Sequence, residues 1–218
     1  MKSPELLQII GVAGAIFLTS FGTSAQIENP PPVKGRWGLS TGVFFDNYKY
    51  DPFWRRGMKP GISPMITYTR GKNQFEIGPQ FQFVRQRYLN QYLGINFNYK
   101  RYFNGFGNKF VPYLYSGIAF STSSSEHVLI GGGGLYSDQR GYKQVGVNLS
   151  IGYGLEWQLG KHLYIGSAVG FNPGFYSVTR TYENYSGAGM NPVIEKSTMN
   201  HIGLNFNVNA QIGYRFGK

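Results

Sequence analysis

The chain has 218 residues, no cysteine, 31 glycines, 17 tyrosines and a formal net charge of +11. The lack of cysteine excludes disulfides, thiolate nucleophiles and cysteine-ligated metals, and the length allows one domain or two small ones. Only 14% of the residues are charged and 17% are aromatic, whereas a soluble domain carries about 25% charged residues. This composition favours a membrane β-protein over a cytosolic enzyme.

Residues 1–25 have the pattern of a secretory signal peptide. Lys2 precedes an apolar run from about Leu6 to Phe21, and Thr23 and Ala25 are small residues placed as expected before a cleavage site. A retained anchor is the alternative, but the run is shorter than the roughly 20 residues that a spanning helix needs. We therefore predict an exported protein whose mature chain begins near Gln26.

The sequence IENPPPVKGR follows, with three consecutive prolines. Proline lacks the N–H that a sheet requires, so residues 26–36 are expected to form an extended periplasmic lead-in. Eight segments then alternate between apolar and polar residues, which is the period of a strand with two unlike faces. These predicted strands cover residues 37–45, 61–70, 74–84, 92–102, 110–121, 144–157, 162–175 and 201–216.

The fifth of these segments is apolar on both faces, so the sequence leaves open which of its faces points inward. The connections between the segments alternate in length. Short turns rich in Gly, Asn and Lys are expected at 70–73, 104–109 and 158–161. Longer loops are expected at 46–60, 121–143 and 176–199, with a shorter one near 85–91. Such alternation is typical of outer-membrane barrels, whose termini both lie on the periplasmic side.

The last segment, HIGLNFNVNAQIGYRF, shows the alternation most clearly. Its even positions, from Ile202 to Phe216, are apolar, and its odd positions, from Gly203 to Arg215, are small or polar. It is much longer than the roughly 5–6 residues of a usual strand, as a strand that crosses a bilayer at a tilt must be. A soluble lipocalin-type barrel is the alternative. Such a barrel would place charged residues on its outer face, whereas the polar faces here carry mainly Asn, Gln, Gly and Ser.

The predicted fold is therefore all-β: an eight-stranded antiparallel up-and-down transmembrane β-barrel, residues 37–218, preceded by a cleavable signal peptide. This pattern of strands and loops resembles the small OmpA/OmpX-like outer-membrane barrels. The stretches SAQ and PYLYSGIAF are similar to members of that group from Bacteroidota. Tyr214 and Phe216, with apolar residues at alternate positions before them, resemble the assembly signal of outer-membrane barrels. The resemblance implies a location in the bacterial outer membrane.

Aromatic residues near the ends of the predicted strands are expected at the lipid–water boundary, where amphipathic rings gather. Tyr102 is one of several such residues. The principal candidates are Trp37, Tyr68, Tyr99, Trp157, Tyr214 and Phe216.

Four charged residues fall on the polar faces and are expected inside the barrel: Glu76, Lys100, Glu156 and Arg215. An unpaired buried charge is costly, and eight strands leave an interior just wide enough for side chains. These residues therefore predict a charge-paired structural plug. A gated ion path or an acid–base pair is the alternative.

Arginines in two outer loops are candidates for contacting lipopolysaccharide, because guanidinium groups bind phosphate well. They are Arg55, Arg56, Arg85 and Arg87. Ordinary anchoring at the membrane interface by basic residues is the alternative role of these four arginines. The predicted partners are outer-membrane lipid and lipopolysaccharide, and other outer-membrane proteins are further candidates. Nucleic acid is not a predicted partner.

The sequence predicts no catalytic residues, metal or cofactor. Its histidines, His127, His162 and His201, are expected in an outer loop, in an inner turn and at the mouth of the last strand, without metal-ligand spacing. A lipid A deacylase of the PagL kind would have a Ser two residues after His201, which is Gly203 here. No amphipathic helix precedes the first strand, as it does in the palmitoyltransferase PagP.

We therefore expect a non-enzymatic barrel that serves envelope structure or surface interaction through its outer loops. An accessory barrel within a larger machine, such as type IX secretion or barrel assembly, is the first alternative. A lipid A-modifying barrel enzyme is the second.

Overall fold

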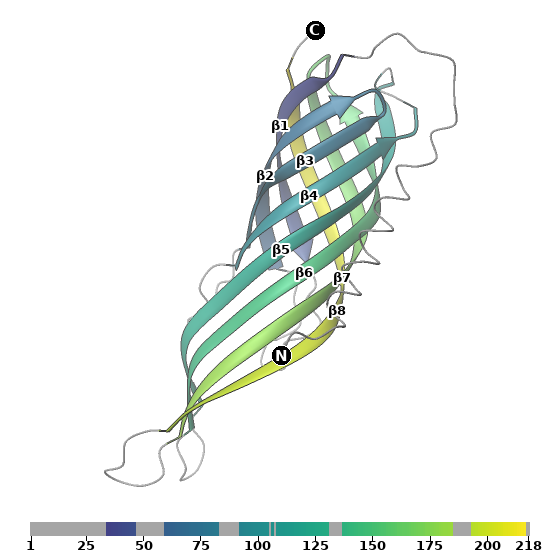
Figure 1. Cartoon of the computed structure of the whole chain (residues 1–218). Helices are drawn as coiled ribbons and strands as arrows, with labels where there is room; N and C mark the ends of the chain where they lie inside the picture. The colour runs from purple at the N-terminus through teal and green to yellow at the C-terminus, as the bar shows by residue number, and fades with distance from the viewer. Residues whose placement is uncertain are drawn as a thin grey trace. The chain divides into compact units, whose positions relative to one another are not determined.

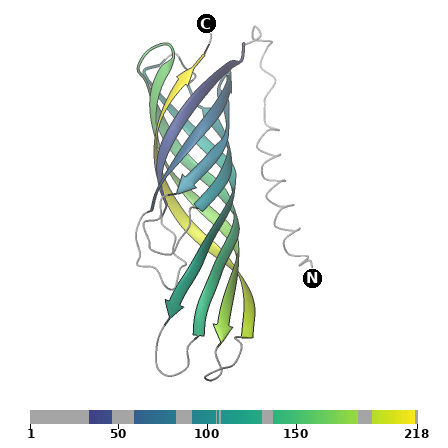
Figure 2. The same cartoon turned by 90° about the vertical axis from the view of Figure 1, so that its left-hand side faces the viewer.

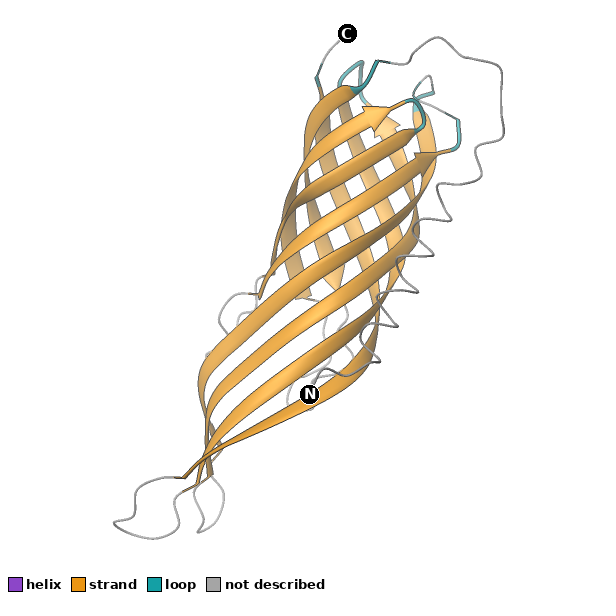
Figure 3. Ribbon diagram, in the orientation of Figure 1, coloured by secondary structure: helices purple, strands orange, loops and turns teal. Residues whose placement is uncertain are grey.

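The computed structural model describes residues 34–46, 59–82, 92–104, 106, 108–130, 137–184 and 193–216. These residues form eight strands: β1 (Arg36–Asp46), β2 (Lys59–Arg70), β3 (Asn73–Gln82), β4 (Tyr92–Tyr102), β5 (Phe110–Ile130), β6 (Ser137–Gln158), β7 (Leu163–Asn184) and β8 (Val193–Arg215). Each strand pairs antiparallel with the next, and β8 pairs with β1 (Figures 1 and 3). The predicted closed, eight-stranded, up-and-down barrel is confirmed.

The described part of the chain contains no helix with the length and apolarity that a membrane crossing requires. The predicted lead-in and signal peptide lie almost entirely outside the described residues, as does most of the predicted loop at 46–60 and all of the one at 85–91. Three tight connections, β2 to β3, β4 to β5 and β6 to β7, lie at one end of the barrel together with the start of β1 and the end of β8. We call this the short-turn end.

The predicted bounds of β1 to β4 lie within two residues of those observed, but β5 to β8 are much longer than predicted. They contain 21, 22, 22 and 23 residues. Most of the segments expected as loops at 121–143 and 176–199 are strand, and His127 lies in β5. The prediction was wrong because it required one apolar face, whereas backbone pairing of a Ser- and Thr-rich strand requires none.

The additional pairs extend beyond the closed part of the barrel (Figure 2). β4 pairs with β5 only as far as Thr122, and β1 pairs with β8 only as far as Asn207. Between these limits and the ends of the strands, the pairings among described residues join β5 to β8 only with one another. We call residues 123–130, 137–144, 178–184 and 193–200 the projecting sheet.

The register around the barrel gives its shear. Starting at Val43 on β1 and stepping to the paired residue on each following strand leads to Asn200 on β8. The residue of β8 that pairs with Val43 is Ala210, ten residues further along that strand. Such a stagger requires tilted strands and leaves an interior that side chains can fill.

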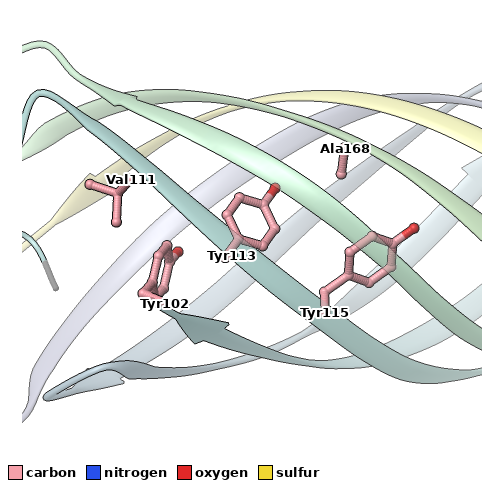
Figure 4. Close-up of a cluster of buried hydrophobic side chains, with 5 residues drawn as sticks. All are labelled: Tyr102, Val111, Tyr113, Tyr115 and Ala168. Carbon is pink, nitrogen blue, oxygen red and sulfur yellow. The ribbon is translucent and has the colours of Figure 1, made fainter. Parts of the chain in front are cut away.

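The structure resolves the inward face of β5. Val111, Tyr113 and Tyr115 are buried inside the barrel, whereas Leu114 and Phe120 are exposed on its outer face. Tyr102, Val111, Tyr113, Tyr115 and Ala168 form an apolar cluster in the interior (Figure 4).

The inward tyrosines lie against glycines of neighbouring strands. The ring of Tyr113 occupies the space where Gly154 would carry a Cβ, and the ring of Tyr164 does so at Gly213. The absence of a side chain on one strand thus makes room for an aromatic ring from another, a known device for supporting glycine within sheets.

We predict that Gly154→Ala destabilises the barrel by about 1–3 kcal/mol, because the new methyl group collides with the fully buried Tyr113. Gly42→Ala is the matched control, since a Cβ there meets nothing closer than 3.4 Å. Urea unfolding of the refolded protein, followed by tryptophan fluorescence, measures both. Equal unfolding midpoints would contradict the packing of Tyr113 on Gly154.

Candidate functional site

Two ion pairs are buried in the barrel interior near the short-turn end. Lys100 Nζ lies 2.6 Å from Glu76 Oε1, and Arg215 Nη2 lies 2.6 Å from Glu156 Oε1. All four residues are buried, and they come from β4, β3, β8 and β6. The four charges predicted to lie inside the barrel therefore meet there as two pairs.

Gln74 of β3 joins the two pairs into one network. Its amide nitrogen donates to Glu76 Oε1 at 2.7 Å, and its amide oxygen accepts from Arg215 Nη2 at 2.8 Å. Tyr102 donates to Glu156 Oε2 at 2.7 Å. The charges are thus held by hydrogen bonds as well as by each other, which buried ions require.

Aromatic rings enclose the Arg215 guanidinium. Its Cζ lies 4.0 Å from the centroid of the Tyr164 ring and 4.3 Å from that of Phe106. A guanidinium at this distance from a ring face is attracted by the ring quadrupole. Together with the hydrogen bonds, this packing fills the lumen at the short-turn end with side chains. We call this arrangement the plug.

The plug contains residues that the sequence analysis did not assign to it. Tyr102, expected at the lipid boundary, is fully buried inside the barrel. Tyr102 lies two residues after Lys100 on β4, so its side chain points to the same inward face. This alternation was the signal from which its burial could have been predicted. Gln74 likewise shares the parity of Glu76. Its role as the link depends on which oxygen and nitrogen meet which charge, and no periodicity encodes this.

A polar cavity lies next to the plug, on the side away from the short-turn end. The centres of water molecules can occupy about 70 Å³ of it, which is room for on the order of five waters. Glu76 and Lys100 lie at its boundary with the plug. Its wall carries seven asparagines and two glutamines: Asn96, Asn98, Asn148, Asn172, Asn205, Asn207, Asn209, Gln80 and Gln211. We call this cavity the amide chamber.

The outer face of the barrel is a continuous apolar belt. Side chains in its middle, such as Ile151, Val169 and Phe206, are 62%, 59% and 65% exposed. Burial alternates residue by residue along β3, and the outward members there are Phe75, Ile77, Pro79 and Phe81. The barrel is thus polar inside and apolar outside, the inverse of a soluble protein.

Aromatic rings gather on this belt at the short-turn end. Trp37 contacts Tyr68, with ring centroids 5.0 Å apart, and Phe75 contacts Tyr99 at 5.3 Å. Phe110 stacks on Trp157 at 6.0 Å, and Tyr214 contacts Phe216 at 5.3 Å. All six residues predicted at the boundary therefore lie in one girdle on the outer surface.

The girdle includes the seam where the barrel closes. The backbone N–H of Phe216 donates to the carbonyl of Trp37 at 2.6 Å, so the end of β8 is tied to the start of β1. Tyr214 and Phe216 are both exposed on the outer face. Recognition of these two residues as an assembly signal stays a prediction.

Other predicted residues do not form a site in the structure. Arg55, Arg56, Arg85 and Arg87 lie outside the described residues. Within the described ranges, no group of three or more His, Asp or Glu side chains could hold a metal. His162 precedes β7 at the short-turn end. His201 stacks on Tyr176 in the part of β8 remote from that end, so the two histidines are not brought together.

No family model and no curated protein matches the chain. Among solved structures, it is similar to a major outer membrane protein from Thermus thermophilus, with 11% identity and a TM-score of 0.54, covering 84% of this chain and 99% of that one. Pseudomonas aeruginosa OprG matches at 14% identity and a TM-score of 0.49, covering 86% of this chain and 98% of OprG. At these identities the likeness shows the fold alone.

We predict that Glu156→Gln destabilises the barrel by about 3–5 kcal/mol, because it leaves the Arg215 charge buried without its counter-ion. Glu195→Gln, at an exposed position of β8, is the matched control and should leave stability unchanged. Adding Arg215→Met to Glu156→Gln should recover a large part of the loss. Urea titration measures the three variants. The plug has no stabilising role if Glu156→Gln and Glu195→Gln unfold at the same urea concentration.

Proposed function

We propose that the protein is a non-enzymatic integral β-barrel of the bacterial outer membrane. The observation that carries the proposal is the inversion of burial. Glu76, Lys100 and Gln74 are buried, whereas Trp37, Ile151 and Ile202 are more than half exposed. Each apolar side chain left in water would forgo about 1.5–3 kcal/mol of burial, and a lipid environment removes this cost. The lipocalin-type alternative predicts the opposite arrangement.

The closed hydrogen-bond ladder also supports a membrane location. In lipid, every backbone polar group must be satisfied within the protein, and a closed barrel achieves this without an edge. The short turns give the proposed orientation, because short turns in outer-membrane barrels face the periplasm. The aromatic girdle then lies at the periplasmic interface. The termini are then periplasmic, and the projecting sheet extends outside the cell.

The projecting sheet is the part of the described structure that supports a surface role. It places four paired strands beyond the closed barrel, in reach of lipopolysaccharide and of external proteins (Figure 2). We propose that the protein acts as a stand-alone envelope protein through this sheet and its outer loops, in the manner of OmpX-like barrels of Bacteroidota. The exposed apolar belt also allows an accessory subunit whose belt contacts another membrane protein.

An enzymatic role is the less supported alternative. The two buried carboxylates are each held in an ion pair with a cation, as a structural plug requires and a catalytic acid–base pair does not. Gly203 stands where a deacylase of the PagL kind would carry its Ser. Comparison of lipid A masses from strains with and without the protein tests this alternative.

A charge in the middle of the belt tests the membrane location. Val169→Arg, at a 59% exposed position on the outer face of β7, should destabilise the protein in lipid vesicles by about 2–4 kcal/mol. Ser197→Arg in the projecting sheet should have no measurable effect, because its side chain stays in water. Urea unfolding in vesicles compares the two. A tolerated Val169→Arg would indicate a water-facing surface and overturn the proposal.

Mild-detergent extraction of the tagged protein from its native membrane, followed by mass spectrometry, separates the two non-enzymatic roles. We expect lipid and lipopolysaccharide to accompany a stand-alone barrel, without a protein in equal amount. A stoichiometric partner protein would instead assign the chain to a larger machine. The outer belt would then be the surface to map by crosslinking.

A further inference from the structure

The amide chamber has an unusual wall for a space inside a protein. Nine carboxamide side chains line it, joined by Ser40, Ser63 and Ser150. Its only charged lining residues within the described structure, Glu76 and Lys100, neutralise each other in a 2.6 Å ion pair. The chamber is therefore polar without net charge. Rings of like-charged side chains, one of the walls that select ions in channels, are absent from the described lining.

Some of these amides have hydrogen-bonding capacity that no described residue uses. Gln211 accepts a hydrogen bond from Lys100 Nζ at 2.9 Å. Because an ammonium group only donates, this contact identifies the accepting atom as the amide oxygen. The Gln211 amide nitrogen is then a buried donor, and it has no partner among the described residues. Gln211 is 8% exposed and lines the chamber.

Unused acceptors lie on the same wall. The Oδ1 atoms of Asn172 and Asn209 have no partner among the described residues, and Asn172 is 8% exposed. Buried polar groups without partners are rare and costly in proteins. An occupant that both donates and accepts hydrogen bonds would satisfy the Gln211 donor and these acceptors together.

Aromatic and apolar surface completes the site. Tyr113, Tyr115 and Phe44 also line the chamber. The Tyr115 hydroxyl donates to Asn207 Oδ1 at 2.9 Å, which fixes the ring against the wall. A ligand with hydroxyl groups around a compact C–H skeleton matches such a mixture of amides and rings. Amides offer a donor and an acceptor each, as a hydroxyl does.

We propose that the amide chamber binds a small neutral polyol of about monosaccharide size. Hydroxyl groups of the ligand bond to Gln211 and Asn172, and its carbon skeleton lies against Tyr115. A ligand with a net charge is disfavoured, since the charges of Glu76 and Lys100 are already matched and the remaining wall is neutral. The chamber is wide enough to replace about five waters by one such molecule.

Binding is tested on the refolded barrel in detergent micelles by saturation-transfer difference NMR. The probes are D-glucose, D-galactose and myo-inositol, with L-lysine and L-glutamate as charged comparators. We expect saturable binding of at least one polyol and none of either amino acid. The proposal is overturned if no polyol binds, which would leave a water-filled space only. It is also overturned if the charged comparators bind as well as the polyols do.

Two substitutions localise the binding to the chamber. Asn172→Val removes an acceptor that has no described partner, so the fold is retained while polyol binding weakens about three- to ten-fold. Gly42→Leu directs a side chain into the chamber from a position where a Cβ meets nothing closer than 3.4 Å. It should abolish binding. Asn200→Val, at an exposed position of β8, is the control and should bind as the parent does.

A second measurement does not depend on the strength of the NMR effect. The chain has no cysteine, so Ser150→Cys creates a single thiol in the chamber wall. A saturating polyol should slow its reaction with a small hydrophilic thiol reagent several-fold. Ser197→Cys, exposed on the projecting sheet, should react at the same rate with and without polyol. If the polyol does not slow the reaction of Ser150→Cys, or if a folded Gly42→Leu protein binds polyol as the parent does, any bound polyol lies elsewhere and the proposal is overturned.

Discussion

Antiparallel pairing between β8 and β1 connects the two ends of a chain of eight strands and removes both edges of the sheet in the closed part of the barrel. The pairing runs from Gly38 and Arg215 to Asp46 and Asn207. Because each strand in the closed part is then bonded on both sides, its backbone is satisfied there without water. Its outer side chains are free to be apolar, and its inner ones must fill or line a lumen. The apolar belt, the plug and the chamber all follow from this closure.

The closure also explains how far the sequence could predict the fold. Within the closed part, one face of each strand is apolar and the other polar, so a period of two located β1 to β4 and the inward charges. In the projecting sheet, by contrast, most residues are polar and no face is regularly apolar, so its strands have the composition of loops. On β5, Tyr113 and Leu114 are both apolar in pattern although they face opposite ways. Only the register with β4 and β6 decides between them.

The partners within the plug were beyond the sequence for a different reason. Parity places Glu76, Lys100, Glu156 and Arg215 on inward faces, but it does not say which cation meets which acid. That choice depends on the stagger of ten residues around the barrel, which sets the heights at which side chains of β8 and β3 meet across the lumen, as Arg215 and Gln74 do. Gln74 bridges the two pairs because of that stagger.

Side-chain size then divides a uniform lumen into two parts. Near the short-turn end, large side chains such as Tyr102, Tyr164 and Arg215 occupy the space, and Gly213 makes room for the Tyr164 ring. Further along, Asn, Ser and Gly replace them at inward positions of the same strands, and the space stays open. The strand geometry is the same in both parts. The sequence therefore closes the barrel at one end through volume and charge pairing, and it leaves a neutral, hydrogen-bonding recess behind the closure.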